Sequence, residues 1–236
     1  MTNARGIAED DNAGLLRHAL ACARAKSADV AAHVHPAWIE TAWQRIGIAP
    51  PPSPDAAGVA RCAIAFASLY GLRWPSLARF ERRAHRIALL PRTEILRVLA
   101  AVALHDDRER VRRCVERGLR SAIVRLVGEA AYQGLIDAPR RPAWAPTALA
   151  AADLDPPRLA AAGYAVLSAQ GAWQCRDMLA WVRLALPPAG TDAEAPAWPV
   201  LPEPAPVLDR LSTYFPEHAW LFGSPMDRAL SAWTTA

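Results

Sequence analysis

Helical periodicity runs through almost the whole chain, and it constrains the fold more than any other feature. Apolar residues recur every three or four positions in most segments, whereas the alternation and β-branched enrichment typical of strands are hard to find. Prolines and glycines punctuate this pattern: Pro36 and Pro75 suit first helical turns, and Gly47 suits a left-handed C-terminal cap. The sequence therefore predicts an all-α fold, a compact multi-helix orthogonal bundle with a Pro-rich connector and a short C-terminal helical tail.

The same pattern places individual helices. Asp106 followed by Glu109 is typical of a capping box for the helix that begins at 107, and Gly118 permits a break after it. The basic outer face of the segment before Pro91 indicates a solvated amphipathic helix. The expected helical ranges are 12–28, 37–46, 58–70, 75–90, 93–104, 107–117, 119–132, 156–170 and 173–186.

The composition changes once, near the C-terminal end. Residues 187–206 hold seven prolines, a composition that favours an extended connector. We therefore expect a helical domain over residues 1–186, divisible into sub-bundles at 1–138 and 150–186, followed by this connector. The aromatic segment 207–236 needs a surface to bury against. It either docks on a partner or folds back onto its own chain, and we favour the second.

Positive charge is concentrated in the middle of the chain. The formal net charge is +4, yet residues 79–125 hold 13 basic and 6 acidic groups, whereas residues 126–236 hold 7 and 11. Clustered arginines can grip nucleic acid or an acidic protein surface. This composition therefore leaves two classes of partner open.

The spacing of acids among these arginines favours a protein partner. Glu109 precedes Arg113 by four residues and Glu116 precedes Arg120 by four, the favourable order for helical ion pairs that neutralise part of the charge. No aromatic residues interleave with the arginines to stack on bases. A solvated or protein-facing helix is therefore favoured over a DNA-binding one.

One set of residues suggests an enzyme. His105 and Asp106, with His85 upstream and Asp153 or Asp155 downstream, match the ligand types of helical metal-dependent phosphohydrolases, in which a metal would activate water. In the simpler alternative, His105 ends one helix, Asp106 caps the next, and His85 lies on a solvated face. We favour that alternative. The sequence has no nucleophile elbow, Walker loop or dinucleotide-binding loop, so we expect no catalytic residue, no metal and no cofactor.

Cysteine usage and hydropathy bear on location. The four cysteines lie 40, 52 and 61 residues apart and form no ligand pair, so they indicate reduced, buried thiols. We expect no membrane-spanning helix, because no uncharged stretch is long and apolar enough to span a bilayer. We also expect no secretory leader, because acids lie within the first twelve residues. The expected location is the cytoplasm.

Three stretches, taken in order, resemble one known family. The first is His35-Pro36-Ala37-Trp38. The second spans Phe80 to Val127, where Arg86-Ile87-Ala88-Leu89-Leu90-Pro91 leads into an apolar helix, a His-Asp turn and an arginine-bearing helix. The third spans Leu159 to Pro187 and ends in Trp181-Val182-Arg183-Leu184-Ala185-Leu186-Pro187. Together they resemble the SctK/YscK family, cytosolic accessory proteins of the type III secretion sorting platform, including Hrp-type members.

The resemblance implies a non-enzymatic scaffold of the injectisome. Such a scaffold would link the SctQ-type pod protein to the cytoplasmic domain of the SctD-type inner-membrane ring, with an SctL-type stalk protein as a further candidate partner. It would lie at the cytoplasmic face of the inner membrane through these proteins, without inserting into the membrane and without binding nucleic acid. From the residues themselves we expect a partner interface at Arg108, Arg112, Arg113, Arg117, Trp220 and Phe222.

Overall fold

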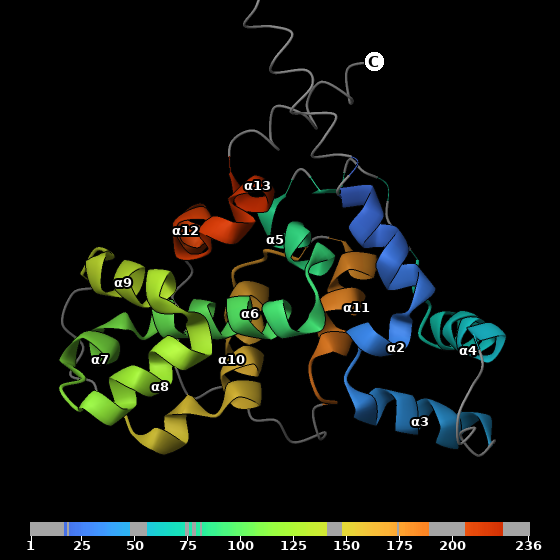
Figure 1. The fold of residues 1–236 in the computed structure, drawn as a ribbon, viewed down its shortest axis with the longest axis horizontal. Helices are drawn as coiled ribbons and strands as arrows, with labels where there is room; N and C mark the ends of the chain where they lie inside the picture. The colour runs from blue at the N-terminus through green and yellow to red at the C-terminus, as the bar shows by residue number, and fades with distance from the viewer. Residues whose placement is uncertain are drawn as a thin grey trace, which may run out of the picture. The chain divides into compact units, whose positions relative to one another are not determined.

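The computed structural model divides the chain into two compact units built from interleaved segments. Unit 1 is drawn from Met1–Arg92, Trp173–Ala193 and Gly223–Ala236, and unit 2 from Thr93–Ala172 and Glu194–Phe222. Every regular element in the described part of the chain is an α- or 3-10 helix (Figure 1), which confirms the all-α prediction. None of the helices described is long and apolar enough to cross a bilayer. The structure describes residues 17, 19–47, 56–73, 76, 79–80, 82–140, 148–173, 175–188 and 206–223, with only the backbone at 56–62 and 206.

Several expected features lie outside the described residues. They are the start of the first helix before residue 17, the proline loop ahead of residue 56, most of the Pro-rich connector and the chain after residue 223. The helix expected over 12–28 is helical in its described part, 19–28.

Unit 1 contains a first set of short helices. After the helical residues 19–28, its elements are α2 (Val30–His33), α3 (Pro36–Ile46), α4 (Ala56–Leu69), α5 (Arg83–Arg86), the 3-10 helix η2 (Ile87–Leu89) and α11 (Arg176–Ala185). Pro36 occupies the first turn of α3, and Gly47 ends that helix with a φ of 71°. Both local predictions are therefore confirmed, because a fixed proline φ and an achiral glycine are what these two positions require.

The last carbonyl groups of α11 receive donors from elsewhere in unit 1. The backbone N–H of His35 donates to the Leu184 carbonyl at 2.7 Å, and the indole N–H of Trp38 donates to the Leu186 carbonyl at 2.8 Å. Arg92 Nε donates to the carbonyl between them, at Ala185, at 3.0 Å. A helix end leaves its last carbonyls without intrahelical donors. These bonds therefore attach the start of α3 and residue 92 to the end of α11.

The basic amphipathic helix predicted over 75–90 is wrong in its described part. Residue 82 is a bend, α5 has four residues, and 3-10 geometry follows it. Arg86 is 0% exposed and its Nε donates to the Phe80 carbonyl at 2.6 Å. His85 is also buried rather than on a solvated face, with Nδ1 2.6 Å from the Arg79 carbonyl. Residues 79–80 have 3-10 geometry, and these two side chains bind their carbonyls, which an α-helical periodicity could not indicate.

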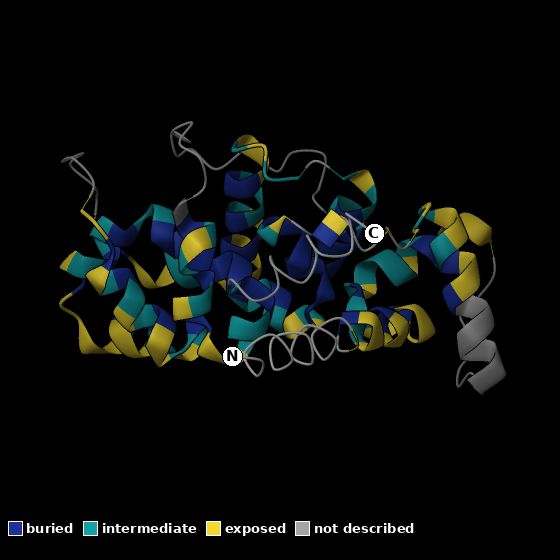
Figure 2. Cartoon of the chain, turned by 90° about the horizontal axis from the view of Figure 1, so that it is seen from above, coloured by how far each residue is buried: buried dark blue, intermediate teal, exposed yellow. Residues whose placement is uncertain are grey.

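Unit 2 is assembled around a helix whose second half is buried on all sides. Its elements are α6 (Arg92–Asp106, from residue 93 on), α7 (Arg108–Arg113), α8 (Arg117–Val127), α9 (Glu129–Asp137), η3 (Ala151–Leu154), α10 (Pro156–Ala169), α12 (Pro206–Tyr214), η4 (Pro216–His218) and α13 (Ala219–Phe222). Residues 98–105 of α6 are all buried, and buried positions are dark blue in Figure 2. A Cβ on Gly163 of α10 would overlap the Leu99 carbonyl oxygen of α6. Glycine at 163 therefore allows the two backbones to touch.

The described C-terminal residues pack against α9 of the same unit (Figure 1). Leu211, Phe215 and Leu221 are each 0% exposed. The Tyr214 ring fits over Gly134 of α9, where a Cβ would lie 2.5 Å from the ring. The aromatic residues in 206–223 therefore contribute to the core of unit 2.

Candidate functional site

Two of the expected interface arginines bind backbone carbonyls within unit 2. Arg108 is 7% exposed, and its guanidinium donates to the carbonyls of Pro139 at 2.7 Å and His105 at 2.9 Å. Arg112 donates from Nε to the Ile136 carbonyl at 2.8 Å and also to the carbonyl of Ala138. Both side chains therefore satisfy carbonyls at and just beyond the end of α9, a role that helix ends require of some donor.

Arg110 connects α7 to the segment that precedes α10. Its guanidinium pairs with Asp107 at 2.9 Å and with Asp153 at 2.5 Å, and it donates to the Ala148 carbonyl at 2.9 Å. Burial raises the pKa of Asp107 to about 6, against the opposing effect of Arg110. Burial would also raise the pKa of Asp153, but hydrogen bonds from the Ala150 N–H and from Arg110 hold it below its ordinary value.

The capping box predicted at Asp106 and Glu109 is wrong. The N-cap of α7 is Asp107, whose side chain makes no capping bond, and Glu109 pairs with Arg112 at 2.6 Å. The reason is that α7 is only six residues long, and its carboxylates bind arginines instead of backbone N–H groups.

The residues considered for a metal-dependent hydrolase are occupied in other ways. His105 Nδ1 lies 2.6 Å from the Tyr214 hydroxyl, His85 binds the Arg79 carbonyl, and Asp153 pairs with Arg110. Among the described residues, the only three His, Cys, Asp or Glu ligand atoms within 4.8 Å of one another belong to Glu94, Glu217 and His218. No member of the expected metal set belongs to that group.

An arginine occupies the group formed by Glu94, Glu217 and His218. Arg97 pairs with Glu94 at 3.2 Å and with Glu217 at 2.8 Å, and His218 Nε2 lies 3.1 Å from Glu94. The positive charge that these carboxylates need is therefore supplied by the protein. The group is an ion-pair network between α6 and η4, whose members lie up to 124 residues apart in the sequence.

Arg97 also reaches two further parts of unit 2. Its Nε donates to the Val127 carbonyl at the end of α8 at 3.0 Å, and its guanidinium lies 5.1 Å from the centroid of the Phe215 ring. Arg97 therefore ties α6, the end of α8 and the C-terminal segment together.

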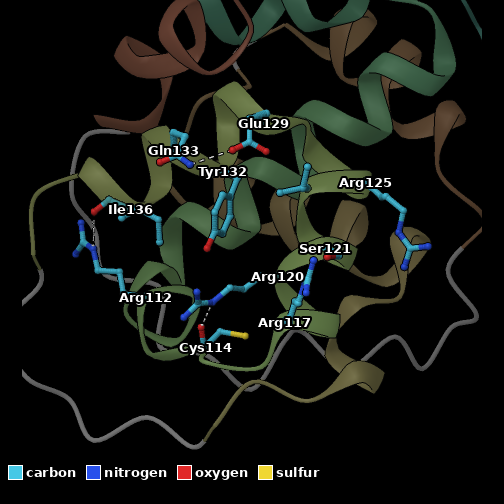
Figure 3. A pocket seen from close by; sticks show the side chains of 11 residues that line it. Arg112, Cys114, Arg117, Arg120, Ser121, Arg125, Glu129, Tyr132, Gln133 and Ile136 are labelled. Atoms are coloured by element: carbon cyan, nitrogen blue, oxygen red, sulfur yellow. Dashed lines mark hydrogen bonds between the residues drawn. The ribbon is translucent and has the colours of Figure 1, made fainter.

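A groove lies on the surface of unit 2 along α8 and α9 (Figure 3). It is open to solvent and has a volume of about 690 Å³. Arg120 lies in it with Nε donating to the Cys114 carbonyl at 2.7 Å, and Tyr132 projects from α9 toward its centre. The lining residues are Arg112, Cys114, Arg117, Arg120, Ser121, Val124, Arg125, Glu129, Tyr132, Gln133 and Ile136.

The structure separates the six expected interface residues by exposure. Arg113 and Arg117 are exposed, and Trp220 is partly exposed. Phe222, by contrast, is 1% exposed inside unit 2, and the other two arginines bind the carbonyls described above. The surface that remains open to a partner therefore centres on α8.

Sequence reasoning missed Arg125 and Tyr132 as parts of this surface. Arg117, Ser121 and Arg125 recur every four residues on α8, so the polar stripe was visible in the sequence. The neighbouring helix that completes the groove was not.

A comparison with protein-family models identifies the chain. The model described as bacterial type III secretion protein (HrpB4) matches residues 16–217, which include α2 to α12 and most of η4. No curated protein and no solved structure matches the chain significantly. HrpB4 proteins are of the SctK/YscK type, so the resemblance drawn from the three sequence stretches is confirmed. This chain belongs to the HrpB4 family of bacterial type III secretion proteins.

Proposed function

We propose that this protein is a non-enzymatic scaffold of the type III secretion sorting platform. It joins the SctQ-type pod protein to the cytoplasmic domain of the SctD-type inner-membrane ring and so supports secretion. Through these partners it lies at the cytoplasmic face of the inner membrane, and an SctL-type stalk protein is a further candidate neighbour.

The family match over residues 16–217 is the observation that carries this proposal. Two properties of the structure support it. The chain forms two compact units, which offers separate bodies for separate partners. His85, His105 and Asp153, which were considered for catalysis, instead bind other groups of the same protein and so help to hold its helices together.

Reconstitution from purified proteins tests the linking role. The pod protein and the ring protein's cytoplasmic domain are mixed with and without this chain, and the mixtures are separated by size-exclusion chromatography with light scattering. We expect one peak that contains all three proteins, and separate pod and ring peaks when this chain is left out.

Two outcomes would contradict the proposal. If the pod and ring proteins co-elute equally well without this chain, it is not their link. If it binds one of them and never both at once, it is an accessory of that partner and not a scaffold.

A further inference from the structure

We propose that the groove along α8 and α9 is a docking site for an acidic, partly apolar segment of a protein partner. The inference rests on the proposed scaffold function and adds the place on this chain where one of its partners binds. The groove belongs entirely to unit 2.

The charge of the groove selects an acidic partner. Its lining includes four arginines, of which Arg112 pairs with Glu109, and one glutamate, Glu129, whose side chain accepts a hydrogen bond from Gln133 at 3.0 Å. Arg117, Arg120 and Arg125 are all exposed on α8 (Figure 3). A guanidinium binds a carboxylate through two parallel hydrogen bonds, which makes arginine well suited to hold aspartate or glutamate side chains.

Part of this arginine cluster is held in place before a partner arrives. Arg120 is anchored through Nε to the Cys114 carbonyl, whereas all three guanidinium nitrogens of Arg112 bind Glu109 and the carbonyls of Ile136 and Ala138. An anchored guanidinium loses less conformational freedom when a ligand binds. The anchoring therefore favours binding at Arg120.

The position of the arginines on α8 opposes helix stability. Arg117 is the first residue of α8 and Arg120 lies in its first turn, which contains no acid, and the N-cap residue Glu116 makes no capping hydrogen bond. The N-terminus of a helix carries partial positive charge, so cations there are unfavourable and anions are favourable. An incoming carboxylate would relieve that repulsion, whereas the free protein retains it.

Part of the groove lining is apolar. Val124, Tyr132 and Ile136 are partly exposed lining residues. Val115, which is not a lining residue but follows the lining residue Cys114 in the loop that leads into α8, adds an apolar side chain that is 83% exposed. A purely charged ligand such as a nucleic-acid backbone would leave these side chains uncovered, and its phosphates would meet Glu129. A protein segment that carries both carboxylates and apolar side chains covers the whole surface.

Charge reversal with a matched control tests the site. The full-length double variant Arg117→Glu/Arg125→Glu is compared with Arg24→Glu/Arg73→Glu, which changes the net charge equally at two exposed positions outside the groove. Binding of each to the purified pod protein, to the ring protein's cytoplasmic domain and to duplex DNA is measured by biolayer interferometry at about 50 and about 300 mM NaCl, because salt screens charge interactions more strongly at the higher concentration. A third variant, Val115→Ser, probes the apolar contact without disturbing the core.

We expect the groove variant to bind one of the two proteins about tenfold more weakly at low salt, mainly through slower association, with a smaller difference at high salt. The control variant should bind both within about twofold of the wild type, and Val115→Ser should weaken the same partner. The thermal unfolding temperature of the groove variant should stay close to that of the wild type, because a carboxylate at position 117 favours the N-terminus of α8 whereas the loss of the cation at position 125 disfavours its C-terminus.

The overturning results are distinct. If the wild type binds a partner and both double variants bind it equally well, the groove is not the site, and this result does not bear on the scaffold function. If the wild type binds neither protein, both proposals fail. If only duplex DNA binding falls in the groove variant, the surface serves nucleic acid and the protein-docking proposal is wrong.

Discussion

Tyr214 joins the C-terminal segment to the buried helix α6, and its replacement by phenylalanine removes a single oxygen from that junction. The residue is 0% exposed, and its hydroxyl lies 2.6 Å from Nδ1 of His105, which is 5% exposed. Burial raises the pKa of Tyr214 to about 12, so the hydroxyl stays protonated near neutral pH. Tyr214→Phe therefore removes a buried hydrogen bond and keeps the ring that packs over Gly134.

The expected cost follows from what is left behind. A buried hydrogen bond contributes about 1 kcal/mol net, and an unpaired buried polar atom adds roughly 1–3 kcal/mol. Because Nδ1 of His105 would lose its partner, we expect the free energy of unfolding of unit 2 to fall by about 2 kcal/mol. The double variant His105→Leu/Tyr214→Phe should cost less than the sum of its single changes, since it removes both partners of this hydrogen bond together.

Urea unfolding followed by circular dichroism gives the stability, and hydrogen exchange by mass spectrometry shows whether α12 opens. Tyr132→Phe is the matched control, because Tyr132 is partly exposed in the groove, and it should change stability by less than about 0.5 kcal/mol. If Tyr214→Phe unfolds at the wild-type urea concentration and the α12 amides keep their protection, the reasoning is refuted. If EDTA instead destabilises the wild type by a similar amount, His105 would be a metal ligand.

Three further changes test other parts of the account. Gly163→Ala should lower the free energy of unfolding by more than about 3 kcal/mol or prevent folding, because its Cβ would overlap the Leu99 carbonyl oxygen, whereas the control Gly118→Ala should be close to neutral. The midpoints of urea unfolding measure both changes, and equal midpoints for the two variants would contradict the close contact. Arg97→Met should lower the free energy of unfolding by about 2 kcal/mol and speed amide exchange in residues 214–223, because it removes the ion pairs and the cation–π contact that hold η4. An unchanged exchange rate in those residues would contradict this role of Arg97. Burial lowers the pKa of Lys26 from 10.5 to about 7. Between those two pH values the unfolded chain binds one proton more than the folded chain, so the free energy of unfolding should rise with pH. Lys26→Met should flatten this rise, and a variant whose pH profile is identical to that of the wild type would refute the prediction.

Signals carried by a few neighbouring residues were predictable from the sequence. The all-α class, the start of α3 at Pro36 and its glycine cap at Gly47 all depend on local backbone preferences, which the residue types express directly. The amphipathic pattern of α8 was visible for the same reason.

Features that depend on distant residues were not predictable. A break that no glycine or proline marks was not predictable either: it falls between α7 and α8 at 114–116 and not at Gly118, and the Cys114 carbonyl there accepts a bond from Arg120. The hydrogen-bond partner of each arginine could not be predicted either. The sequence shows that Arg108 is charged, but not that its guanidinium donates to the Pro139 carbonyl. The hydrogen-bond partners of such long side chains come within reach only after the chain has folded.

The candidate site shows both cases together. The basic run at 108–125 is visible in the sequence, but which of its members face solvent depends on where α9 ends, and the Ile136 carbonyl that Arg112 binds there lies 24 residues further along. Arg112 binds there, whereas Arg117 and Arg125 do not enter any contact of that kind that the structure describes. Burial, which separates structural from partner-facing arginines, is a property of the tertiary fold.

The most direct test of the scaffold proposal is made in the bacterium that encodes this protein. A fluorescent pod protein and a fluorescent ring protein are imaged in cells with and without the gene for this chain. The proposal predicts that the ring foci persist in the deletion strain, that the pod foci disperse and secretion stops, and that the wild-type gene restores both. Pod foci that remain at the ring in the deletion strain would contradict the claim that this protein links the two.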